Sequence, residues 1–244
     1  MKQTEVIMGM PITIDVVDEA APDTLPSIFK YFRKIDECYS PYKTTSEVSK
    51  ANGGTPIERL SAEFRWILDL CAQTKSETMG YFDAYHGSNL DPSGLVKGWA
   101  IQNAANQLRL KRHANFYIEA GGDVQIDGLN EDGKPWSLGI RNPFDTQTIV
   151  KHLALSGCGV ATSGTYIRGD HIYDPVHDFT APTAIQSITI IGPNVYDADR
   201  FATAAFAMGL DGIGFIENLN GFEAYMIDDT QTATFTSGLS RYVA

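Results

Sequence analysis

Apolar residues at the start of the chain alternate with polar ones and then recur with helical spacing. The alternation at residues 4–17 predicts a strand. Residues 24–36 place a set of apolar side chains on one helical face, namely Leu25, Ile28, Phe29, Phe32 and Ile35. The chain is therefore expected to begin with a strand and a helix.

Two further helices are predicted before residue 112. Ser61 can cap the first of them, on which a second apolar set shares a face: Phe64, Ile67, Leu68 and Cys71. Pro92 stands near the start of the next helix, which runs to about Leu108, because proline is tolerated in the first helical turn. The N-terminal part is thus expected to be mainly helical.

From residue 114 onward the pattern becomes typical of strands. Apolar runs broken by Gly, Asn, Asp and Pro turns predict strands at 115–120, 136–141, 150–157 and 186–192. One more helix is expected at 197–208, followed by a C-terminal hairpin around the polar turn at 228–231. The fold class predicted is α+β, with largely antiparallel sheets and packed helices.

The sequence contains no internal repeat, low-complexity tract or linker, which predicts one domain over residues 1–244. The change from helical to strand-like pattern divides that domain into two lobes, 1–112 and 113–244. A hydrophobic content of 43% and a charged content of 20% are typical of a folded globular chain.

The net charge of the chain limits the kinds of molecule that it is expected to bind. Nineteen basic and 30 acidic residues give a net charge of -11, which would repel a nucleic-acid backbone and an anionic membrane surface. Nucleic acid is therefore not an expected partner. An anionic cofactor would need local amides, a lysine or a divalent cation to reverse the field, so a metal site is worth seeking.

The N-terminus lacks the apolar core of a secretory signal, because Glu5 and Asp15 interrupt it, and no segment has the length of a membrane span. Three separated cysteines, Cys38, Cys71 and Cys158, encode neither a disulfide framework nor a zinc site. A cytoplasmic location without membrane insertion is the expectation.

The segment DADRFATAAFAMG at 197–209 carries the clearest local signal for chemistry. Asp199 and Thr203 are four residues apart, so they share one face of a short helix. A carboxylate and a hydroxyl are ligands that Mg²⁺ accepts, usually with water and substrate phosphates completing its shell. The alternative is an ordinary first helical turn, in which the helix dipole favours Asp199.

Two glycine-containing segments are also candidates. LDPSGLVKGWA at 90–100 leads into a helix beside Lys97, an arrangement that suits a diphosphate but is equally typical of a simple helix cap. IEAGGDVQIDG at 118–128 places a double glycine before Asp123, which permits close backbone approach or merely a tight turn. Neither a dinucleotide-binding G-x-G-x-x-G nor a P-loop sequence is present.

The segment ATSGTYIRGDHIYDPVHD at 161–178 is dense in polar side chains. His171 near Asp174 forms a candidate acid-base pair, since histidine titrates near neutrality and a neighbouring carboxylate tunes it. A solvated loop with a His-Asp contact explains the same residues. Ser163 is not expected to be a hydrolase nucleophile, because the G-x-S-x-G elbow is missing.

In their order along the chain, the segments VIMGMPITI, SPYKTTSEVSKAN, LDPSGLVKGWA, EAGGDVQIDG, SGTY, HIYDP and DADRFATAAFAMG resemble the ApbE family of FAD:protein FMN transferases. The resemblance covers nearly the whole chain. Its shortened stretch His86-Gly87-Ser88-Asn89 replaces a longer family segment, and the lipid-attachment cysteine of many members is not found here.

The resemblance implies roles for individual residues. Asp199 and Thr203 are implied to ligate Mg²⁺ through side-chain oxygens, and Gly94 through its backbone carbonyl. His171 matches the family histidine that is a candidate for accepting the proton of the attacking hydroxyl. The positions implied to contact FAD are Met8, Tyr42, Asp83, Asp91, Lys97 and Tyr173.

The implied reaction is transfer of FMN from FAD to a Ser or Thr hydroxyl of an acceptor flavoprotein or flavin-binding domain, with release of AMP. The FAD site would lie between the two lobes. Family acceptors carry a short Ser/Thr target motif that this chain lacks, so self-modification is not expected. The alternatives are an Mg²⁺-dependent FAD pyrophosphatase that gives free FMN and AMP, and a non-catalytic FAD-binding protein.

Overall fold

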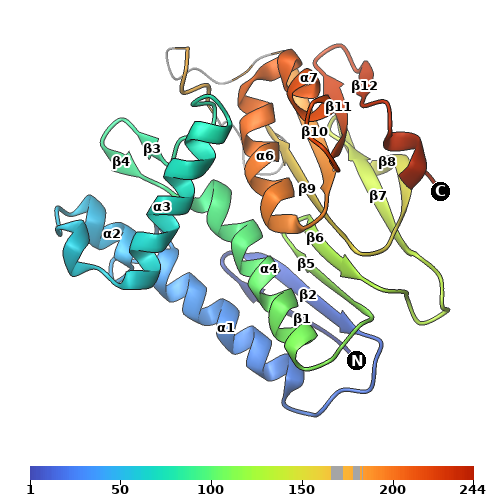
Figure 1. Ribbon diagram of the computed structural model, residues 1–244, viewed down its shortest axis with the longest axis horizontal. Helices are drawn as coiled ribbons and strands as arrows, with labels where there is room; N and C mark the ends of the chain where they lie inside the picture. Colours follow the sequence, from blue (N-terminus) through green and yellow to red (C-terminus); the bar gives the residue numbers. More distant parts are fainter. Residues whose placement is uncertain (166–172, 178–181, 183) are drawn as a thin grey trace.

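The computed structural model describes residues 1–165, 173–177, 182 and 184–244. In this part of the chain an eight-stranded antiparallel sheet has the order β1-β2-β5-β6-β9-β10-β11-β12 (Figure 1). Its strands are β1 (Lys2–Ile7), β2 (Met10–Val16), β5 (Phe116–Ala120), β6 (Asp123–Asp127), β9 (Cys158–Gly164), β10 (Ile185–Gly192), β11 (Glu223–Asp228) and β12 (Ala233–Phe235). Two small hairpins, β3 (Tyr85–His86) with β4 (Asn89–Leu90) and β7 (Trp136–Asn142) with β8 (Asp145–Leu155), pair separately.

The predicted single strand at 4–17 is wrong, because the structure divides it into the β1–β2 hairpin. The turn is Met8-Gly9, and both residues have left-handed φ angles, 58° and 72°. A two-residue turn of this kind matches the twist of the flanking strands. Alternation continues through such a turn, so the pattern alone does not mark the break.

The predicted helices are present, and their ends differ from the predicted ones by only a few residues. Ser61 accepts a hydrogen bond from the Phe64 amide at the start of its helix, as its capping role requires, and Asn194 caps the helix that carries Asp199 in the same way. These helices are α1 (Thr24–Tyr39), α3 (Ala62–Glu77), α4 (Ser93–Leu110) and α6 (Val195–Ala207). Two short helices, α2 (Glu47–Asn52) and α7 (Gly212–Glu217), were not predicted.

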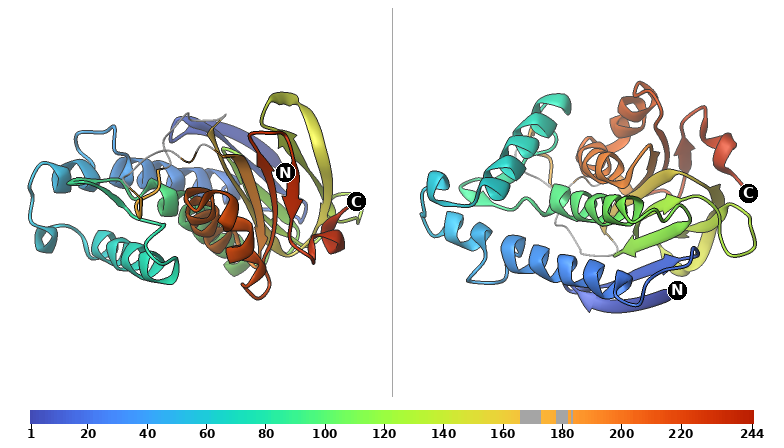
Figure 2. Two further views of the ribbon diagram at one scale, coloured as in Figure 1. Left: turned by 90° about the horizontal axis from the view of Figure 1, so that it is seen from above. Right: turned by 60° about the horizontal axis from the view of Figure 1, so that its bottom comes forward.

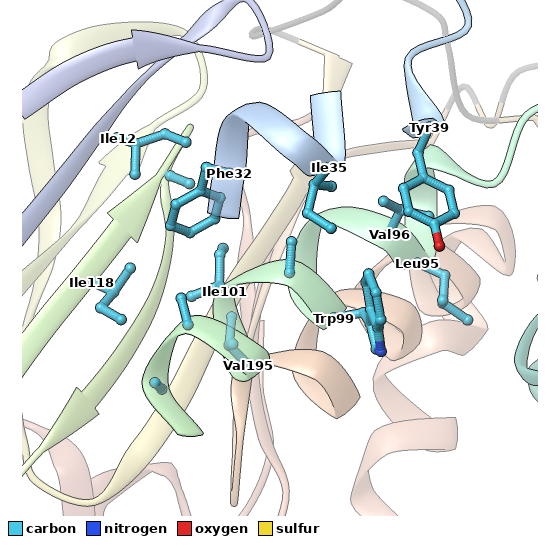
Figure 3. Close-up of a cluster of buried hydrophobic side chains, with 14 of the residues drawn as sticks. Ile12, Phe32, Ile35, Tyr39, Leu95, Val96, Trp99, Ile101, Ile118 and Val195 are labelled. Carbon is cyan, nitrogen blue, oxygen red and sulfur yellow. The ribbon is translucent and has the colours of Figure 1, made fainter. Parts of the chain in front are cut away.

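Helices cover one face of the sheet, and the β7–β8 hairpin covers part of the other (Figure 2). Apolar side chains of α1 and α4 pack on β2 and β5, as the cluster around Phe32, Ile101 and Ile118 shows (Figure 3). A second cluster joins α6 to β9, β10 and β11, and a third lies between the sheet and β7–β8. Central strands such as β6 and β10 are therefore buried on both faces.

The main sheet contains strands from both sides of residue 112, where the pattern changes from helical to strand-like. Strand β2, from the helical part, pairs with β5, from the strand-rich part, over Ile12–Ala120 to Val16–Phe116. Residues 1–112 and 113–244 thus share one hydrogen-bonded sheet, and their division into lobes stays a prediction. Among the described residues, no helix has both the length and the apolarity needed to cross a bilayer.

Candidate active site

Close packing of α4 against α6 brings the motif residues of both helices together. Gly94 and Gly98 are four residues apart and therefore share one face of α4. A β-carbon added to Gly98 would lie 2.6 Å from the Asp199 β-carbon, and one added to Gly94 would lie 3.2 Å from the Thr203 methyl. Glycine at both positions allows the two backbones to approach and sets Asp199 and Thr203 against the start of α4.

A pocket opens beside this crossing. Its wall combines the β3–β4 region, the first turns of α4, the ends of β5 and β9, residues 173–175 and α6. The described residues that line it are Tyr81, Phe82, Asp83, His86, Asn89, Asp91, Ser93, Gly94, Lys97, Gly121, Thr162, Ser163, Gly164, Tyr173, Pro175, Asp199 and Thr203. Both predicted lobes contribute, which agrees with a site placed between them.

Two buried carboxylates share one lysine at this pocket. The Lys97 ammonium lies 2.5 Å from Asp123 Oδ2 and 3.4 Å from Asp199 Oδ1. The Gly98 amide donates to Asp199 Oδ2 at 2.7 Å, and the Thr162 amide donates to Asp123 Oδ1 at 3.1 Å. Two carboxyl groups therefore face a single ammonium group in a buried place.

The buried position of Asp199 affects its protonation. Burial raises the pKa of Asp199 to about 7, because the charged carboxylate loses its hydration. The ammonium of Lys97 opposes the rise in pKa, the negative charge of Asp123 adds to it, and the Gly98 amide opposes it. A further cation at Asp199 would favour the ionised form, which is the form that ligates metals.

The predicted metal ligands fit a hard cation in donor type. Thr203 Oγ1 donates to the Gly94 carbonyl oxygen at 3.4 Å, so these two oxygens face each other across the α4–α6 contact. Asp199 is one helical turn away from Thr203 and is 3% exposed. Among the described residues there is no group of three or more His, Cys, Asp or Glu side chains that could hold a metal. Carbonyl, hydroxyl and carboxylate oxygens with water and phosphate are, however, the donors that Mg²⁺ prefers.

Two planar side chains form another part of the wall. The rings of His86 and Tyr173 stack with centroids 4.2 Å apart and planes inclined by 29°. The Tyr173 hydroxyl donates to the Asp83 carbonyl oxygen at 3.4 Å. Burial, aided by the negative charges of Asp83 and Asp91, raises the pKa of Tyr173 to about 12, so its phenol stays a neutral donor at neutral pH.

A known protein family matches most of the chain. The sequence model of the ApbE family matches residues 8–89 and 84–226, which together cover most of the chain. The chain belongs to the ApbE family. The two matched stretches meet at residues 84–89, which include the β3–β4 turn.

Relatives with assigned names give the same family. The FAD:protein FMN transferase of Haemophilus influenzae is 26% identical over 197 residues, which are 76% of this chain and 57% of that protein. The FAD:protein FMN transferase of Vibrio cholerae is 30% identical over 150 residues, which are 58% of this chain and 45% of that protein. The chain thus spans about half the length of the curated relatives that it matches.

Solved structures of the family share the fold. The flavin transferase ApbE from Vibrio cholerae superposes with a TM-score of 0.87 at 21% identity, covering 100% of this chain and 99% of that chain. The ApbE protein from Thermotoga maritima gives the same TM-score at 20% identity and the same coverage. The predicted ApbE-like α+β fold is confirmed.

The pocket contains most of the residues that the family resemblance implies as metal ligands or FAD contacts. Asp83, Asp91, Gly94, Lys97, Tyr173, Asp199 and Thr203 all line it. Asp83 and Asp91 are used locally, because Asp83 pairs with Lys75 at 2.6 Å and Asp91 accepts from the Ser93 amide at 3.0 Å. Their proposed contacts with FAD stay predictions.

Two implied FAD contacts lie outside the pocket lining. Met8 forms the β1–β2 turn and packs on the helix-side core. Tyr42 is 93% exposed, in the turn between α1 and α2. The structure does not bring these two side chains to the other candidates, and their roles stay predictions.

The candidate base lies outside the described residues, so its predicted role is not tested. Its expected partner, Asp174, faces a different histidine: His177 Nδ1 lies 2.9 Å from Asp174 Oδ2. The amides of Val176 and His177 also donate to Asp174 Oδ1. Asp174 thus organises a local turn with His177, and His171 keeps its role only as a prediction.

The sequence pattern does not single out two residues that the structure brings forward: His86, which lines the pocket, and Asp123, which contacts the pocket residue Lys97. Asp123 follows the double glycine, but the sequence pattern does not mark it as a site residue, because its partner Lys97 is distant in sequence. His86 lies in the shortened turn and carried no motif signal. An acidic residue at the start of a doubly buried strand is the signal that could have identified Asp123.

Proposed function

We propose that this chain transfers FMN from FAD to a Ser or Thr hydroxyl of an acceptor protein in an Mg²⁺-dependent reaction. The observation that carries the proposal is the buried Lys97–Asp123–Asp199 cluster beside Thr203 and Gly94 in the pocket. Family membership and relatives named FAD:protein FMN transferase support it.

Different residues of the pocket would contact the diphosphate of a dinucleotide and the metal. Lys97 supplies a positive charge whose position is fixed by Asp123 at 2.5 Å. Asp199, Thr203 and the Gly94 carbonyl are the groups that would hold Mg²⁺. When bound, the metal neutralises charge on the diphosphate and on the transferring phosphoryl group.

In the proposed reaction the acceptor oxygen forms a bond to the FMN phosphorus. The bond from that phosphorus to the bridging oxygen breaks, and AMP leaves with the bridging oxygen. The proton of the attacking hydroxyl passes to a base, for which His171 is the candidate taken from the family resemblance. The acceptor is a flavoprotein or flavin-binding domain that carries a Ser/Thr target motif.

The test incubates the protein with FAD and Mg²⁺, with and without an acceptor domain, and measures AMP release and protein-bound flavin fluorescence. We expect both signals only when the acceptor is present. Neither signal is expected with an acceptor whose target Ser or Thr is replaced by Ala. AMP and free FMN without acceptor would instead indicate an FAD pyrophosphatase. FAD binding without AMP release would indicate a non-catalytic flavin-binding protein.

A further inference from the structure

The β3–β4 hairpin is a braced part of the pocket wall. Its two strands pair at Tyr85–Leu90 and His86–Asn89, which leaves Gly87-Ser88 as the turn. Asn52 of α2 holds the base of the hairpin twice: its side-chain amide donates to the Leu90 carbonyl at 2.9 Å, and its oxygen accepts from the Leu90 amide at 2.8 Å. A side chain on this hairpin therefore stands on a fixed support.

The ring of His86 lies on this support and contacts the next segment of the pocket. It stacks against Tyr173, which belongs to a stretch, 173–177, without helix or strand. The Tyr173 hydroxyl reaches the Asp83 carbonyl, just before the hairpin. The stack on the face of the Tyr173 ring and the hydrogen bond from its hydroxyl together define the position and the tilt of this ring.

The hairpin is also the place where the match to the family is divided. The family's two matched stretches, 8–89 and 84–226, overlap there. His86 thus lies in the short segment that both matched stretches contain. Aromatic faces are the usual platforms for planar heteroaromatic rings, because offset stacking of rings is favourable.

We propose that His86 is a positioning residue, which holds Tyr173 by stacking so that the Tyr173 ring forms a wall for a planar ring of FAD. This inference rests on the proposed function only in taking FAD as the ligand. His86 itself acts through Tyr173 and not on the reacting phosphorus.

The test measures the Kd for FAD by quenching of flavin fluorescence, together with KM and kcat for AMP release. His86→Ala is expected to raise Kd and KM roughly three- to tenfold, the range of a lost ring pair, with kcat unchanged at saturating FAD. His86→Phe keeps a flat ring and is expected to retain the parent Kd. His152→Ala, which alters an exposed histidine on β8, serves as the matched control.

A double-mutant cycle separates positioning from direct contact. In a Tyr173→Ala background, adding His86→Ala is expected to leave Kd unchanged, because the ring that His86 supports is gone. Additive effects, a parent-like Kd for His86→Ala, or failure of His86→Phe to retain binding would each overturn the inference. FAD binding without transfer by the parent would overturn the proposed function alone, whereas a parent that does not bind FAD would overturn both.

Discussion

At the scale of single residues, the proposed metal site depends most on Asp199. Its carboxylate is buried beside Asp123, and Lys97 is the ammonium that both carboxylates share. Removal of one negative charge from this group leaves a balanced Lys97–Asp123 pair. Replacing Asp199 by a neutral residue should therefore lower activity without lowering stability. This combination distinguishes a metal ligand from an ordinary helix residue.

Asp199→Asn is expected to lower Mg²⁺-dependent AMP release at least about a hundredfold, because several kcal/mol of charge stabilisation in the transition state would be lost. The melting temperature is expected to stay constant or rise, since an asparagine oxygen still accepts from the Gly98 amide. Thr203→Ala should act in the same direction but more weakly, because water can replace a neutral ligand. The measurements are AMP release against Mg²⁺ concentration and thermal melting.

Parent-like activity of Asp199→Asn with parent-like dependence on Mg²⁺ would contradict this role. Asp199 would then be a buried helix residue that contributes only to the α4–α6 contact. A large loss of melting temperature would also be contrary to expectation, because it would mean that the ionised carboxylate stabilises the fold.

A second residue prediction concerns pH and the turn between α4 and β5. Partial burial alone would raise the pKa of Asp18, but hydrogen bonds from the Asn115 side chain and the amides of Asn115 and Ala114 outweigh it and lower the pKa. A lowered carboxyl pKa stabilises the fold above the unfolded value and loses that contribution as the pH falls through the folded pKa.

Asp18→Asn is therefore expected to lower the free energy of unfolding at pH 7 by roughly 1 kcal/mol, discounted for partial exposure. The difference from the parent should shrink as the pH falls below about 4, where the parent carboxyl also becomes protonated. Urea unfolding at several pH values measures this. A difference that is constant from pH 7 to pH 3 would show that charge is not the cause.

At the scale of elements, the contact between α4 and α6 builds the site. Gly98→Ala is expected to destabilise the fold by about 1–3 kcal/mol, since the new β-carbon would overlap with Asp199 and the Val195 carbonyl and force the helices apart. FAD turnover should fall with it. Gly214→Ala in α7 is the matched control, because open space surrounds that position and alanine favours a helix. Equal melting temperatures for the two variants would contradict close packing at Gly98.

Helices α1 and α3 were predictable because each has one face on a core and one in solvent. The set Leu25 to Ile35 on α1 is buried as the spacing indicated. Strands β6 and β9 were not predicted, because both are covered on two sides and carry polar residues at the site: Thr162 lines the pocket, and Asp123 contacts Lys97. Alternation is absent in strands of this kind.

The site was predictable only in part for a similar reason. Asp199 and Thr203 share a helical face, so local spacing was enough to pair them. Their meeting with Gly94 and Lys97 depends on how α4 crosses α6, which spacing does not encode and the family resemblance implied. His86 gave no signal, because its stack with Tyr173 joins two segments that are distant in sequence.

At the scale of the whole molecule, the pocket is lined by residues of both predicted lobes. We expect tighter binding of FAD than of FMN, because the Lys97 and Asp199 cluster is placed for the diphosphate that only FAD contains. Titration calorimetry in the presence of Mg²⁺ measures both affinities. Equal affinities would argue against a site built around the diphosphate.

The central claim is that the chain moves FMN from FAD to another protein. Mass spectrometry of an acceptor domain, after incubation with the protein, FAD and Mg²⁺, tests it most directly. The account predicts that the acceptor gains one FMN group on its target hydroxyl and that AMP appears in equal amount. An acceptor that stays unmodified while FAD is bound or hydrolysed would contradict it.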